Sequence, residues 1–153
     1  MKKNLLLFVA LIFTCPIFSA DPPEKNAPAK PIELTRSEFL TKVFNYEENT
    51  EVWKYNGDKP AIVDFYATWC GPCRITAPIL ADLAKEYGEA IYVYKIDVDK
   101  EPELASVFGI QSIPTFIFIP QKGDPQMAMG ALPKETFKKV IDDFLLQKTS
   151  LRE

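Results

Sequence analysis

The spacing of hydrophobic residues along this 153-residue chain changes repeatedly between the period of a helix and the run of a buried strand. Apolar or alternating runs of strand type occupy residues 61–67, 91–98, 115–119 and 126–129. Helical spacing occupies residues 35–46, which begin with the capping-box pattern of Thr35 and Glu38, and also residues 73–87 and 102–108. Pro133 opens a last helix. With a first strand near Ile32, the predicted order is β-α-β-α-β-α-β-β-α.

This order of elements predicts a three-layer α/β fold. Strands that alternate with helices form a sheet covered on both faces, because each crossover helix packs back onto the sheet. The hairpin of residues 115–119 and 126–129 adds antiparallel pairing, so we expect a central mixed sheet. The folded domain is expected to span residues 32–148, followed by a short tail at 149–153.

Residues 1–20 have the pattern of a secretory signal peptide. Two lysines precede an apolar run at residues 5–13 that is too short to span a bilayer. An uncleaved anchor or a buried core helix is one alternative, and a lipid attached to Cys15 is another. Residues 21–31 are rich in proline and lack a hydrophobic period, which predicts a flexible tether. We therefore expect an exported, periplasmic protein, anchored to the membrane if Cys15 is lipidated.

Composition and charge narrow the classes of partner. The chain has 18 basic and 21 acidic residues, a net charge of −3 and no basic cluster, which argues against nucleic acid binding. Its 47% of hydrophobic residues is enough for one core, and a monomer is the expected state.

Cys70 and Cys73 carry the strongest chemical signal. The same spacing forms half of many zinc sites, but zinc normally takes four ligands and the chain has no histidine, so we expect no metal and no cofactor. The pair lies where a strand leads into a helix, whose first turn brings both sulfurs to disulfide distance and stabilises a thiolate on Cys70. Pro72 suits that turn, and Gly71 allows another chain to approach. A structural disulfide or two buried thiols is the alternative.

The segment at residues 65–74, Phe-Tyr-Ala-Thr-Trp-Cys-Gly-Pro-Cys-Arg, resembles the active-site segment of the thioredoxin family. The resemblance to that family continues in four other segments, at residues 77–78, 95–99, 109–115 and 130–131. The resemblance extends from about Ile32 to Leu146. It implies a thioredoxin fold and, together with the leader, an exported thioredoxin of periplasmic type.

The resemblance also implies a mechanism. Cys70 is expected to attack a disulfide in a target protein, and Cys73 to resolve the mixed disulfide that forms. Asp64 lies inside an apolar strand, so burial should raise its pKa, and the resemblance implies that it takes the proton from Cys73. Lys95 is its expected charge partner. A paired structural carboxylate and a solvated lysine are the alternatives for these two residues.

A substrate groove is implied around the cysteines. Ile113 and Pro114 resemble the cis-proline site of the family, whose loop offers backbone groups to an extended substrate chain. The alternatives are that Pro114 only starts the next strand and that Trp69 is a core aromatic. The residues expected to form the groove are Trp69, Gly71, Pro72, Ile113, Pro114, Gly130 and Ala131.

Two features depart from the family pattern. Tyr66 stands where many members have a second tryptophan, and the segment at 47–59 is longer than in the compact cytosolic form. Trp53 and Tyr55 in that segment either anchor a surface loop or form a partner-binding surface.

The leading functional hypothesis is a reductase-like thiol-disulfide oxidoreductase that acts on disulfides of exported proteins. It requires a membrane redox partner that reduces or oxidises the dithiol, because export places the chain in an oxidising compartment. A periplasmic disulfide oxidase or isomerase is the second hypothesis. The lack of a histidine between the cysteines argues against a strong oxidant. A non-catalytic redox-sensing binding module is the third.

Overall fold

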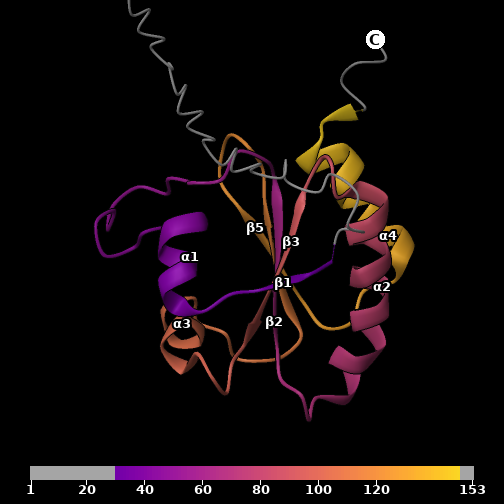
Figure 1. The fold of residues 1–153 in the computed structure, drawn as a ribbon, viewed down its shortest axis with the longest axis horizontal. Coiled ribbons are helices and arrows are strands. Elements are labelled where there is room, and N and C mark those ends of the chain that lie inside the picture. The colour runs from indigo at the N-terminus through magenta and orange to yellow at the C-terminus, as the bar shows by residue number, and fades with distance from the viewer. Residues whose placement is uncertain (1–29, 149–153) are drawn as a thin grey trace, which may run out of the picture.

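The computed structural model describes residues 30–148, in which helices cover both faces of a five-stranded sheet (Figure 1). The predicted signal peptide with Cys15, most of the predicted tether and the tail at 149–153 lie outside the described residues. Within residues 30–148, none of the helices combines the length and the apolar character that a membrane span requires.

The sheet has the strand order β1-β3-β2-β4-β5. Its strands are β1 (Ile32–Glu33), β2 (Ala61–Tyr66), β3 (Tyr92–Asp97), β4 (Thr115–Ile119) and β5 (Gln126–Met129). The first three strands in this order run parallel, whereas β4 pairs antiparallel with both β2 and β5. The predicted mixed sheet is confirmed: crossover helices connect the parallel strands, and the short loop at residues 120–125 connects β4 to β5.

The helices lie in two pairs on opposite faces of the sheet, α1 with α3 and α2 with α4 (Figure 1). Successive side chains of a strand point to opposite faces, so Val63 and Phe65 of β2 pack beneath α1 and α3, whereas Ile62 packs beneath α2 and α4. By the same alternation, Asp64 faces the α2 side. The helices are α1 (Arg36–Lys42), α2 (Gly71–Tyr87), α3 (Pro102–Val107) and α4 (Lys134–Val140), the last continuing as a π-helical turn over Ile141–Leu145.

The loop at residues 47–59 is anchored on the fold by its aromatic residues. The Trp53 ring lies 4.4 Å from the Phe44 ring, and both it and Tyr55 pack against the core beneath α1 and α3. The Tyr55 hydroxyl donates to the Lys59 carbonyl oxygen at 2.6 Å. These contacts favour an anchored surface loop over a partner-binding surface.

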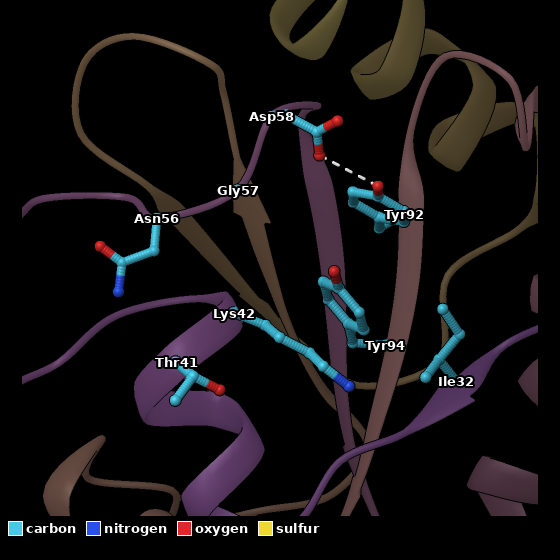
Figure 2. Close-up of a pocket in the computed structure, with 8 residues that line it drawn as sticks. All are labelled: Ile32, Thr41, Lys42, Asn56, Gly57, Asp58, Tyr92 and Tyr94. Atoms are coloured by element: carbon cyan, nitrogen blue, oxygen red, sulfur yellow. Dashed lines mark hydrogen bonds between the residues drawn. The ribbon is translucent and has the colours of Figure 1, made fainter.

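The same loop borders a cavity of about 510 Å³ at the edge of the sheet (Figure 2). The stacked rings of Tyr92 and Tyr94 from β3 line it, and the Tyr92 hydroxyl donates to Asp58 of the loop at 3.0 Å. Tyr92 begins β3, whereas the cysteines follow the carboxyl end of the parallel strand β2. The cavity therefore lies at the end of the sheet opposite the cysteines.

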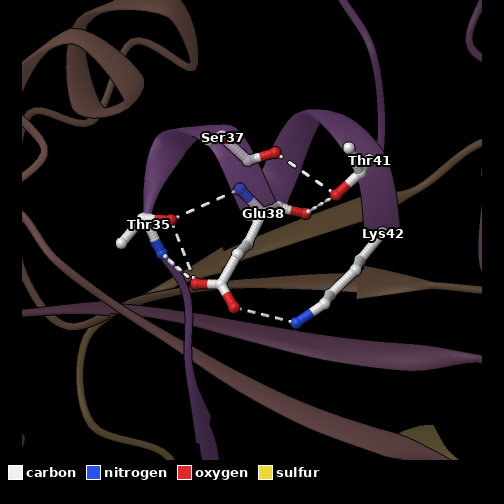
Figure 3. Close-up of polar contacts among 5 residues, drawn as sticks. All are labelled: Thr35, Ser37, Glu38, Thr41 and Lys42. Atoms are coloured by element: carbon white, nitrogen blue, oxygen red, sulfur yellow. Dashed lines mark hydrogen bonds and ion pairs between the residues drawn. The ribbon is translucent and has the colours of Figure 1, made fainter.

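The helix α1 begins at the capping box that the sequence predicts (Figure 3). The Glu38 backbone N–H donates to the Thr35 hydroxyl at 3.3 Å, and the Glu38 carboxylate accepts from the Thr35 backbone N–H at 3.0 Å. The carboxylate also pairs with Lys42 at 2.9 Å. The contacts made by the carboxylate, first of all the hydrogen bond from the Thr35 backbone, lower the pKa of Glu38 to about 2.

The end of α1 differs from the prediction, since the helix stops at Lys42 rather than near Tyr46. The Asn45 side chain accepts hydrogen bonds from the backbone N–H groups of Glu47 and Glu48, which forms a turn in place of a further helical turn. The hydrophobic spacing continues past the helix because the residues that follow it are still buried.

Candidate active site

Cys70 and Cys73 lie where β2 leads into α2. Cys70 is the N-cap residue of the helix, and the Cys73 backbone N–H points at the Cys70 Sγ over 3.2 Å. A disulfide joins the two sulfurs, and their Cα atoms are 5.3 Å apart. The unpaired N–H groups of this helix end stabilise negative charge on the Cys70 sulfur once the disulfide is reduced.

Gly71 and Pro72 form the first turn of α2. The helix begins at Gly71 rather than at the predicted Cys73, because the Cys70 sulfur provides the cap. Pro72 is exposed and occupies a turn in which backbone N–H groups have no helical partner, so its ring costs no hydrogen bond. Added at Gly71, a Cβ atom would meet only the Arg74 side chain, at 3.9 Å. The turn therefore leaves space beside the disulfide.

The loop before β4 lies against the cysteines. Its Ile113–Pro114 peptide bond is cis, and the Ile113 carbonyl oxygen lies 3.7 Å from the Cys70 Sγ. The Pro114 carbonyl oxygen accepts from the Gly130 backbone N–H at 2.8 Å. Gly130 has a φ of 86°, in the left-handed region that favours glycine, and the exposed Ala131 follows it. The structure thus brings three separate segments of the predicted groove together.

Trp69 is exposed beside the disulfide rather than buried in the core, with 66% of its surface accessible. Its indole Nε1 donates to the Asp99 carboxylate at 2.7 Å, which fixes the orientation of the ring. A cavity of about 390 Å³ lies beside the ring, lined by residues of α3 and by Trp69, Val98, Ile110 and Ile113. The sequence identified Trp69 and Ile113, but no local pattern indicated that α3 and Asp99 would adjoin them.

Asp64 is buried in the centre of the sheet. Only 1% of the surface of Asp64 is exposed, and among the described residues no hydrogen-bond donor reaches its Oδ1. Burial raises the pKa of the Asp64 carboxyl to about 7, an effect that the positive charge of Lys95 opposes and the negative charge of Glu33 increases. The raised pKa expected from the sequence is therefore present in the fold.

Lys95 acts on Asp64 through its charge, as the sequence predicts, but the carboxylate with which it forms an ion pair is that of Glu33. Its Nζ lies 3.6 Å from the Glu33 carboxylate and 4.0 Å from the centre of the Tyr66 ring. Lys95 and Asp64 are neighbours in the β3–β2 ladder, so the ammonium acts on Asp64 only through space. Sequence reasoning missed Glu33, because only the pairing of the two-residue strand β1 with β3 places it beside Lys95.

The side chains that carry chemistry at this site are two sulfurs and one buried carboxylate. Within residues 30–148, no group of three or more His, Cys, Asp or Glu side chains is arranged to hold a metal ion.

Comparisons with known proteins agree with this geometry. A sequence model of the family described as Thioredoxin matches residues 35–143. Thioredoxin of Borreliella burgdorferi is 47% identical over 113 residues, which cover 74% of this chain and 96% of that protein.

Solved structures give the same result. Chloroplastic thioredoxin z aligns with a TM-score of 0.64 and 28% identity over 77% of this chain and 96% of its own. A point mutant of thioredoxin from Halobacterium salinarum NRC-1 aligns with a TM-score of 0.61 and 26% identity, over 78% of this chain and 95% of its own. The family match over most of the folded region and the Cys70–Cys73 disulfide lead to one conclusion: the chain belongs to the thioredoxin family and is a thiol-disulfide oxidoreductase.

Proposed function

We propose that this chain reduces disulfide bonds of exported proteins with the Cys70/Cys73 dithiol. The observation that carries the proposal is the position of the cysteine pair, at the amino end of α2 and against the Ile113–Pro114 loop. A thiolate is stabilised at that helix end, and the loop provides backbone beside the attacking sulfur.

The proposed reaction has two exchange steps. The Cys70 thiolate attacks one sulfur of the target disulfide, which breaks that bond, forms a Cys70–target disulfide and releases the other target sulfur as a thiolate. The Cys73 thiolate then attacks the Cys70 sulfur, which closes the Cys70–Cys73 disulfide and releases the second target thiolate. Two electrons pass from the dithiol to the target, and both target thiolates take up protons.

Asp64 is the proposed proton acceptor for Cys73. The Cys73 thiol must lose its proton before it attacks, and Cys73 lies on α2, which covers the sheet face that Asp64 faces. A carboxyl with a pKa of about 7 exchanges protons readily near neutral pH, unlike an exposed aspartate. Lys95 adjusts the charge balance of that carboxyl.

The proposed substrate surface surrounds the disulfide. Trp69 and the cavity beside it supply apolar contact on one side. The remaining contacts come from the first turn of α2 and the loops at residues 113–114 and 130–131, whose backbone suits an extended peptide. No cofactor is needed for this exchange.

The residues between the cysteines favour electron flow from the dithiol to the target disulfide. Gly71 and Pro72 form the dipeptide typical of reducing thioredoxins, and no histidine is present to favour a strongly oxidising pair. Export to the periplasm, argued from the pattern of residues 1–20, would require a membrane redox partner that returns electrons to the dithiol.

A trapping experiment tests this function in the full chain. In the Cys73→Ser variant the first exchange step occurs but the second cannot, so stable mixed disulfides through Cys70 should accumulate. The control is Cys70→Ser, which should trap nothing. The trapped partners should be exported proteins, and dithiothreitol should release them by reducing the mixed disulfides. If Cys73→Ser traps no more protein than Cys70→Ser, the chain does not exchange disulfides with proteins. A set of purely cytoplasmic partners would overturn the proposed location.

A further inference from the structure

Three side chains of alternating charge lie in one row across the sheet. Glu33 of β1 pairs in register with Lys95 of β3, which in turn pairs in register with Asp64 of β2. These strands are parallel, and residues in register on neighbouring strands point to the same face. One ammonium thus stands between an edge carboxylate and a buried carboxylate, on the face that α2 covers.

Lys95 is held on the Glu33 side of this row. Its Nζ lies 3.6 Å from Glu33 Oε2 and 4.0 Å from the centre of the Tyr66 ring. The Tyr66 hydroxyl donates to Glu33 Oε1 at 2.5 Å, so each oxygen of this carboxylate has its own partner. In the described part of the chain Lys95 forms no ion pair with Asp64, and Asp64 Oδ1 has no hydrogen-bond partner.

We propose that Glu33 and Tyr66 are positioning residues that hold the Lys95 ammonium away from Asp64, and so keep the Asp64 carboxylate able to bind a proton during the dithiol reaction. The proposal deepens the function proposed above and rests on the role given there to Asp64. A cation acts more strongly on a buried carboxylate than on an exposed one, because water screens it less. Drawing Lys95 towards the half-exposed Glu33 therefore raises the proton affinity of Asp64.

Other titratable groups near this face are few or already paired. Asp97 follows Lys95 along β3, and its carboxylate pairs with Lys100 at 3.5 Å and accepts from the Asp99 backbone N–H at 3.1 Å. Phe116 of β4 pairs in register with Asp64, and Phe137 of α4 packs in the same apolar cluster as Phe116. Neither side chain can titrate.

The helix α2 adds two titratable side chains to this face. These are Cys73 at its start, which titrates only when reduced, and Tyr87 at its other end, where the hydroxyl contacts Asp142. In the oxidised protein Cys73 is part of the disulfide and does not titrate, so the titration of Asp64 can be measured without a contribution from Cys73.

The test measures the titration of the Asp64 carboxyl by NMR in the oxidised full chain. The Glu33→Gln variant removes one negative charge and frees Lys95, so the proton affinity of Asp64 should fall about tenfold, or about one pH unit. Tyr66→Phe keeps the ring under Lys95 but removes the hydroxyl, and should shift the titration in the same direction by less. The matched control Glu89→Gln removes an exposed charge after α2 and should leave the titration unchanged.

A second measurement separates this proposal from the function on which it rests. In Glu33→Gln joined to a target through a Cys70 mixed disulfide, with Cys73 as a free thiol, the pH profile for release of the target should shift to lower pH, together with the titration. A shifted titration with an unchanged profile would support the positioning role and remove Asp64 from the reaction. An unchanged or raised Asp64 proton affinity in Glu33→Gln would overturn the positioning role, and Tyr66→Phe decides the question if Glu33→Gln does not fold.

Discussion

Asp64 is a carboxyl group whose burial makes its charged form costly. In the unfolded chain its pKa is near the ordinary value of 3.8, whereas in the oxidised fold burial raises the pKa to about 7. The folded state therefore binds an extra proton between these two values. Stability contributed by the neutral carboxyl is fully present below about pH 4 and is lost as the pH rises to about 7.

The variant Asp64→Asn tests this linkage. Between about pH 4 and pH 7 the native chain can lose at most about 4 kcal/mol of its free energy of unfolding through this carboxyl, because each pH unit corresponds to about 1.36 kcal/mol. Asp64→Asn should lack this loss, so its free energy of unfolding relative to the native chain should rise between pH 4 and pH 8. Denaturation of the oxidised proteins in urea at both values measures it, with the exposed Asp124→Asn as control. Identical pH dependence of the native chain and Asp64→Asn would mean that the carboxyl is not perturbed.

At the scale of elements, α1 depends on a cap that the sequence alone predicts. Thr35→Ala removes the hydroxyl that accepts from the Glu38 backbone N–H, and the free energy of unfolding should fall by about 1 kcal/mol. Thermal or urea denaturation measures the change. The control is Thr50→Ala in the exposed loop, which should change stability by less than about 0.5 kcal/mol. Equal effects of both variants would argue against the cap.

The loop at residues 47–59 allows a prediction that separates its two interpretations. If Trp53 is an anchor, Trp53→Ala should lower the free energy of unfolding by about 2–3 kcal/mol through the lost contact with Phe44, and leave the rate of disulfide exchange unchanged. Lys54→Ala, at an exposed neighbour, is the control for both measurements. A partner-binding surface predicts the reverse, with little loss of stability and weaker trapping of partners.

At the scale of the whole molecule, the local sequence predicts the elements better than it predicts the contacts between them. The pair Cys70 and Cys73 and the burial of Asp64 follow from residues next to them in the chain, and so do the strand and helix periods. The partner of Lys95 does not, because the register of β1 with β3 joins residues far apart in sequence. The hydrogen bond from Trp69 to Asp99 was missed for the same reason.

The reduction potential of the Cys70–Cys73 disulfide tests the proposed reducing activity most directly. The full chain would be equilibrated with dithiothreitol and glutathione buffers of defined potential, and the fraction of oxidised protein measured in each. A reducing member of the family predicts a potential near about −270 mV, so that the dithiol passes electrons to target disulfides. A value between about −180 and −120 mV would contradict this and mark the chain as an isomerase or an oxidase.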